Sequence, residues 1–169
     1  RYDESKRLLQ RAAADKQYAA IASAITARIN GALAASAQAR AGTPAGKQAF
    51  TAALQALRDT AEQLNKAGHV SLALAIDQGT DRIGGSVSSS KLDRADLVKR
   101  VAISQRSVMR ARQSLALKRC VDASKVIEEG LQADPANAEL KAFQPQAQQH
   151  ITDAEDLYKT ANKMRRFEG

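Results

Sequence analysis

The chain has 169 residues, a length that suits one domain of ordinary size or one compact helical array. Apolar residues make up 44% of it, which is enough for a packed core and excludes wholesale disorder. There are 35 alanines but only three Phe, three Tyr and no Trp. This composition excludes a β-sandwich or barrel and predicts an all-α chain whose helices approach one another closely.

The formal net charge is +8, which favours an acidic partner such as nucleic acid, anionic lipid or an acidic protein. The single Cys120 excludes an internal disulfide and a Cys-based metal cluster. No apolar run approaches the ~18 residues that a membrane span needs. Because the first residue is Arg1 rather than Met, we expect a fragment of a larger protein, cytoplasmic or periplasmic.

Gly, Pro and Ser residues punctuate seven predicted helical segments. In chain order these segments cover residues 3–14, 18–38, 44–66, 69–83, 91–117, 120–132 and 135–166. The fourth segment also fits a strand, because Leu72, Leu74 and Ile76 alternate, but no other segment offers a strand to pair with it.

Short polar residues and glycines predict where several of these helices begin and end. The expected signals are Thr43 before Pro44, Ser90 with Asp93 three residues later, Asp134 before Pro135, and Ala67-Gly68 after the third helix.

Apolar stripes predict the buried face of each long helix. The clearest stripe steps by four and three residues along Phe50, Leu54, Leu57, Ala61 and Leu64. The others are Ile21, Ile25, Ile29 and Leu33; Val101, Val108 and Leu115 with Ser104 and Ala111 beside them; and Leu140, Phe143, Ala147, Ile151, Ala154, Tyr158 and Ala161. The last stripe keeps its register across Pro145, so we expect a kink or a short restart there rather than a full break.

Three helix–turn–helix units align with one another, and their second helices begin at Tyr18, Val70 and Cys120. The third unit, RCVDASKVIEEGLQADPANAEL over residues 119–140, resembles a tetratricopeptide repeat. In that family, small residues at the positions of Ala123 and Gly130 let the two helices of a hairpin pack closely. Residues 65–75 are similar to the family's turn and second-helix start.

The resemblance implies antiparallel hairpins stacked as a short right-handed solenoid with a long C-terminal capping helix. We therefore expect one helical domain over residues 1–169, with hairpins at about 3–38, 44–83 and 91–132 and the capping helix at 135–166. The spacing between units is near 50 residues, whereas the family period is about 34. A helical bundle without repeats is the alternative.

No residue pattern indicates catalysis, so we expect no enzyme activity, no catalytic residue, no cofactor and no metal site. His69 and His150 have no carboxylate or Cys at metal-ligand spacing. Cys120 has no His within a helical turn to activate it. Gly84-Gly85-Ser86 lacks the remaining residues of a phosphate-binding loop.

Basic residues concentrate in the fifth predicted helix and the turn that follows it. Residues 98–121 contain no acid and seven cations: Lys99, Arg100, Arg106, Arg110, Arg112, Lys118 and Arg119. At about 100° per residue, Lys99, Arg106 and Arg110 lie nearly opposite the Val101 stripe. The pattern is typical of a solvated face or of a surface that captures acidic groups.

Together these features predict a non-catalytic protein-interaction or scaffold module that binds a partner peptide or helix in a concave, partly basic groove. By resemblance to tetratricopeptide arrays, whose first helices line such a groove, the candidate partner-binding residues are Lys47, Arg58, Lys99, Arg106 and Arg110. Two alternatives stay open. One is sequence-non-specific binding of nucleic acid through the basic helix 99–119. The other is self-association of a region from a larger, membrane-anchored bacterial protein.

Overall fold

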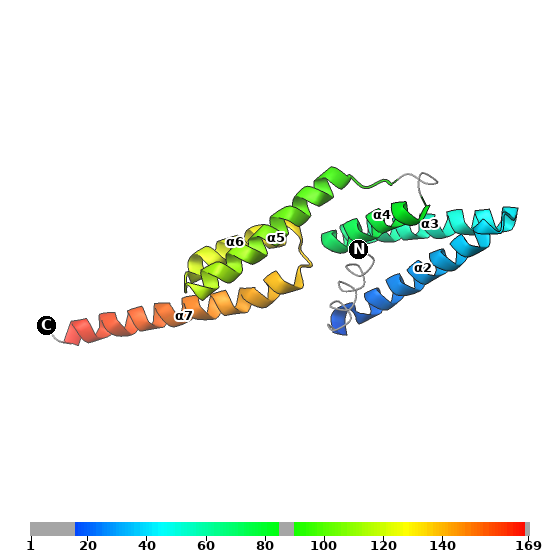
Figure 1. The fold of residues 1–169 in the computed structure, drawn as a ribbon. Helices are drawn as coiled ribbons and strands as arrows, with labels where there is room; N and C mark the ends of the chain where they lie inside the picture. The colour runs from blue at the N-terminus through cyan, green and yellow to red at the C-terminus, as the bar shows by residue number, and fades with distance from the viewer. Residues whose placement is uncertain (1–15, 85–89, 168–169) are drawn as a thin grey trace. The chain divides into compact units, whose positions relative to one another are not determined.

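The computed structural model describes residues 16–84 and 90–167, with side chains over 20–84 and 90–163. Its elements are α2 (Lys16–Arg40), α3 (Pro44–Lys66), α4 (Val70–Gly84), α5 (Arg94–Ala116), α6 (Cys120–Ala133) and α7 (Ala138–Phe167) (Figure 1). The described part of the chain contains no strand, so the all-α prediction is confirmed and the ambiguous fourth segment is a helix. The helix expected at 3–14 lies outside the described residues.

The chain divides into two compact units, Arg1–Leu97 and Val98–Gly169, with the boundary inside the first turns of α5. Each unit has a hydrophobic core of its own. The expected continuous stack of hairpins over residues 1–169 therefore stays a prediction.

The core of unit 1 is built from α2, α3 and α4. On α3, four of the five residues of the predicted stripe are buried, namely Leu54, Leu57, Ala61 and Leu64, and Phe50 is half-buried. On α2 the stripe begins as predicted with buried Ile25, but Leu33 is 39% exposed. The expectation for Leu33 was wrong because residues four apart are separated by about 40° around a helix, so repeated steps of four drift away from the core. Ala32 and Ala35 are buried in its place.

The core of unit 2 is formed by small and aliphatic side chains of α5, α6 and α7. Its members are Ala111, Ala123, Val126, Ile127, Leu140 and Ala147. On α5, Ser104, Ser107 and Ala111 are buried, whereas Val101, Val108 and Leu115 are only half-buried. The prediction placed the larger residues at the centre of this face. The structure places the small ones there, because the helices approach too closely for larger side chains.

One predicted helix cap agrees with the structure and two differ. Thr43 caps α3, since its hydroxyl accepts a hydrogen bond from the Gly46 N–H at 3.1 Å. The Ser90 prediction was wrong for α5: the carboxylate of Asp93 accepts from the Asp96 N–H at 3.1 Å, and the helix begins at Arg94.

The start of α7 also lies later than predicted. Asp134 ends α6 and its carbonyl accepts from the Asn137 N–H at 3.0 Å, so Asp134-Pro135 forms a turn. Asn137 is the cap, because its side-chain oxygen accepts from the Leu140 N–H at 3.0 Å. The helix then continues through Pro145, as the stripe predicted.

The turns after α3 and α5 have the same backbone hydrogen bonds, and both satisfy the last carbonyls of the preceding helix. After α3, the His69 N–H donates to the Leu64 carbonyl at 2.8 Å and Gly68 has φ 86°. After α5, the Arg119 N–H donates to the Ser114 carbonyl at 2.8 Å and Lys118 has φ 57°.

Candidate functional site

The five residues predicted to bind a partner are divided between the two units. Lys47 is exposed in the first turn of α3, in unit 1. Arg58 is buried in the same unit, with 6% of its surface exposed. Lys99, Arg106 and Arg110 are exposed on α5 in unit 2.

Arg58 belongs to an ion-pair cluster that joins α3, α4 and the first residue of α5. Its guanidinium lies 3.5 Å from Asp77 and 2.8 Å from Asp81. The guanidinium of Arg94 also pairs with both carboxylates. Hydrogen bonds donated by Arg94 and then by Arg58 hold the pKa of Asp81 below its ordinary value. The hydrogen bonds that Arg94 donates to Asp81 and Asp77 raise the pKa of Arg94. The two carboxylates therefore stabilise the buried charge of Arg58. The Arg58 guanidinium is held inside unit 1 by these ion pairs.

Sequence reasoning did not find this cluster, although one signal was present. Asp77 and Asp81 are four residues apart, so both lie on one face of α4. That face also carries the buried Val70, Ala73 and Leu74 at helical spacing, an unusual place for a carboxylate without cationic partners.

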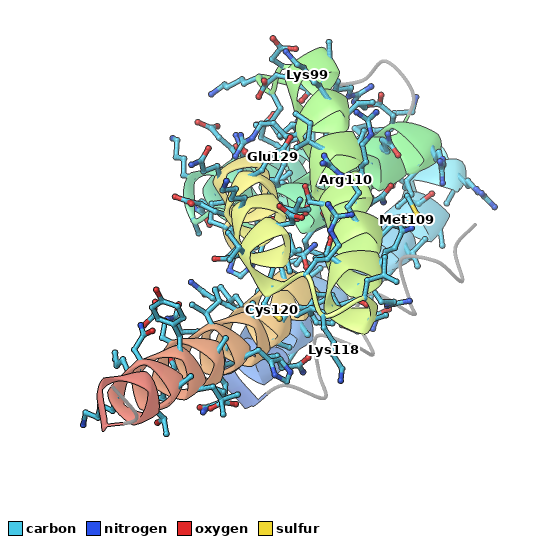
Figure 2. All side chains as sticks on the ribbon, turned by 90° about the vertical axis from the view of Figure 1, so that its left-hand side faces the viewer. Lys99, Met109, Arg110, Lys118, Cys120 and Glu129 are labelled. Carbon is cyan, nitrogen blue, oxygen red and sulfur yellow. The ribbon has the colours of Figure 1, made fainter. Side chains whose placement is uncertain are left out.

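The outer face of α5 is the exposed side of that helix, opposite the buried Ser104, Ser107 and Ala111. It combines basic, apolar and amide side chains: Val98, Lys99, Ala102, Gln105, Arg106, Met109 and Arg110. Met109 is 66% exposed and lies on the side of α5 turned away from α6 (Figure 2).

Cations on this face differ in how far they are already neutralised. Among the described residues, Lys99 and Arg106 make no ion pair. Arg110 reaches Glu129 of α6 at 3.8 Å, and both side chains are more than half exposed, so this pair contributes little and exchanges readily with solvent. By contrast, Arg112 is paired with Glu139 on α7. Lys99 and Arg106 are therefore the cations of the outer face that no carboxylate of the described residues neutralises.

A second exposed surface lies on α7, which extends past the ends of α5 and α6 (Figure 1). Leu157 is 73% exposed and Tyr158 is 70% exposed. Acidic residues are close by in the sequence, at Asp153, Glu155 and Asp156, and all of them are exposed.

Within residues 16–84 and 90–167 there is no group of three His, Cys, Asp or Glu side chains able to hold a metal ion. Cys120 is half-buried and forms no disulfide. None of the helices that the structure describes is both long and apolar enough to cross a membrane.

Comparisons with protein-family models, with curated proteins and with solved structures found no match to this chain.

Proposed function

We propose that this chain is a non-catalytic protein-interaction module that binds an acidic partner helix or peptide along the outer face of α5. The proposal depends on one observation: this face combines exposed apolar side chains with cations that make no ion pair within the described part of the chain. Met109 and Val98 supply apolar contact area. Lys99 and Arg106 supply positive charge that no carboxylate of the described residues neutralises.

An acidic partner follows from the chemistry of these cations. A carboxylate docked against a guanidinium or ammonium group forms charge-assisted hydrogen bonds, and the positive field steers acidic partners toward the face. Arg58 has no part in this proposal because it is buried, and Lys47 has none because it lies in unit 1.

We also propose that the building unit is a tetratricopeptide-like hairpin and that the hairpins stack as a right-handed solenoid. The equivalent turns at Gly68 and Lys118, fifty residues apart, support a repeated unit. Buried Ala123 and Gly130 lie where the resemblance requires small residues.

Binding of nucleic acid is the second candidate, because seven cations lie between residues 98 and 121. Phosphate contacts need cations alone, whereas Met109 at 66% exposure in their midst favours a protein surface. The same experiment separates the two candidates.

The test measures binding of two labelled probes by fluorescence anisotropy: an amphipathic peptide of Leu and Glu heptads, and a duplex DNA of mixed sequence. The pair Lys99→Glu with Arg106→Glu should lower affinity for the peptide at least about tenfold. Met109→Gln should lower it several-fold without any change in charge. A matched control, Lys47→Glu with Lys141→Glu, makes the same change in net charge on exposed residues elsewhere and should leave affinity unchanged.

The same measurements also define the result that would contradict the proposal. If the duplex binds with a steep dependence on salt and Met109→Gln has no effect on either probe, the chain is a nucleic-acid binder and the proposal is wrong.

A further inference from the structure

The outer face of α5 has a different neighbouring helix along each of its two edges. On one edge, Arg110 reaches Glu129 of α6 at 3.8 Å (Figure 2). On the other edge, Arg112 pairs with Glu139 of α7. The two edges of the face can therefore be told apart by the helix that lies beside each of them.

Apolar side chains occupy the middle of the outer face. Val98, Ala102 and Met109 are all exposed and, at about 100° per residue, lie within about 40° of one another around the helix. Val98 is 49% and Met109 66% exposed, and Ala102 lies between them along the helix axis. Because the side chain of Ala102 is small, a partner can approach the backbone of α5 closely at this point.

The cations that make no ion pair within the described residues lie on one edge of this face. At about 100° per residue, Lys99 and Arg106 fall on the same side of the apolar middle as Arg110, which is the edge beside α6. The opposite side carries the uncharged Gln105 and then Arg112, which is already paired. The positive charge available to a partner is therefore one-sided.

An α-helix fits the outer face better than an extended peptide does. The backbone N–H and C=O groups of α5 are used in its own helical hydrogen bonds, so they cannot pair with an extended chain. A partner helix satisfies its own backbone groups and places a side chain on the face every three or four residues. Lys99 and Arg106 are seven residues apart, which is two helical turns or about 10 Å. Two acidic residues seven apart on a partner helix have the same spacing.

We propose that the partner is an amphipathic α-helix that lies along α5 and carries acidic residues on one edge only, toward Lys99 and Arg106. This proposal rests on the proposed function, because it specifies the partner of the same face. An acidic residue on the other edge of the partner meets Gln105 instead of a cation, and one on its back stays in solvent. The position of the acidic residues around the partner helix, rather than its net charge, therefore sets the affinity.

The test compares the binding of three labelled peptides to this chain by fluorescence anisotropy, each at a concentration where the peptide is monomeric. All are heptad repeats with Leu at the a and d positions. The first carries Glu at e, on one edge, and the second carries the same number of Glu residues at f, on the back. The third is the first with proline at the central f position, which breaks the helix. The first peptide should bind at least about tenfold more tightly than either of the others.

Moving one cation across the outer face tests the edge from the side of this chain. Arg106→Gln with Gln105→Lys keeps the net charge and places a cation on the other side of the apolar middle. This pair should lower affinity for the first peptide several-fold, about as much as Arg106→Gln alone. The matched control, Lys141→Gln with Gln144→Lys, moves a cation between two exposed positions of α7 and should leave affinity unchanged. Circular dichroism checks that each variant keeps its helical content.

Three results would overturn the inference, and they separate it from the proposed function. If the first two peptides bind equally, net charge alone sets the affinity. If the proline peptide binds as tightly as the first, the partner need not be a helix. In both cases, loss of peptide binding in Lys99→Glu with Arg106→Glu would still support the proposed function. If none of the peptides binds, the proposed function fails together with the inference.

Discussion

The buried carboxylate of Asp77 on α4 lies 3.5 Å from the guanidinium of Arg58 on α3, and both side chains are almost fully withdrawn from solvent. Asp81 and Arg94 complete the cluster at its more exposed edge. Charges in a protein interior are costly unless they are paired, so each member depends on the others. This ion pair explains why Arg58 is buried, although the sequence alone predicted that it lies on a partner-binding surface.

Removing the carboxylate charge of Asp77 should destabilise unit 1. Asp77→Asn leaves Arg58 buried with fewer carboxylate contacts, and we expect a loss of about 3 kcal/mol in the free energy of unfolding. Urea denaturation followed by circular dichroism measures it. Asp59→Asn, an exposed position on α3, is the matched control and should cost less than about 0.5 kcal/mol. Equal losses for the two variants would contradict the account of the cluster.

The stability of unit 1 should fall in acid partly through Asp81. Hydrogen bonds from Arg94 lower its pKa in the folded chain below the ordinary value of 3.8. The Asp81 carboxylate therefore takes up a proton more readily in the unfolded chain than in the folded chain. The stabilisation is complete above the unfolded pKa and is lost as pH falls through the folded pKa. The stability gap between wild type and Asp81→Asn, measured by urea denaturation, should narrow as pH falls below about 4. A gap that stays constant down to the most acidic pH would argue against the ion pairs as its cause.

Gly130 should tolerate no side chain, although it lies within a helix. A Cβ there would come within 2.6 Å of the Ser107 Cβ and 2.5 Å of Leu140 Cδ1. We expect Gly130→Ala to destabilise unit 2 by about 1–3 kcal/mol, as overpacking does elsewhere. Gly79→Ala on α4 is the matched control, because nothing lies within 4 Å of its Cβ. That change should stabilise by about 0.5–1 kcal/mol, and thermal denaturation compares the two.

The turn after α5 holds a lysine in a conformation that favours glycine. Lys118 has φ 57°, and the equivalent position after α3 is Gly68 with φ 86°. Lys118→Gly should therefore stabilise unit 2 by about 1 kcal/mol in thermal denaturation. Lys118→Ala removes the charge but keeps the Cβ, so it should show no such gain. A gain of the same size for both variants would assign the effect to charge rather than to backbone strain.

Much of the secondary structure was determined by the sequence acting over short distances. The stripe from Leu54 to Leu64 and the Thr43-Pro44 start involve residues within one or two helical turns, and both were predicted correctly. Asn137 shows the limit of such signals. Asp134-Pro135 resembles a helix start, but the chain first completes a turn and is capped three residues later.

Only part of the candidate surface could be predicted from the sequence. Lys99 and Arg106 were predicted because cations recur on the side of α5 opposite its apolar residues, and both are exposed. The contribution of Met109 was missed, because one apolar residue among polar ones carries no periodic signal. It became visible only when the burial of Ser104 and Ser107 showed which side of α5 faces the core.

The sequence by itself determined that the chain is helical, where most helices lie and how charge is distributed along it. Only the tertiary structure decided which charges are buried and which are free. Arg58 and Asp77 are 19 residues apart in the chain, and their pairing exists only because α3 packs against α4. Helix propensity and periodicity act over a few residues, whereas the environment of a charge depends on every segment folded around it.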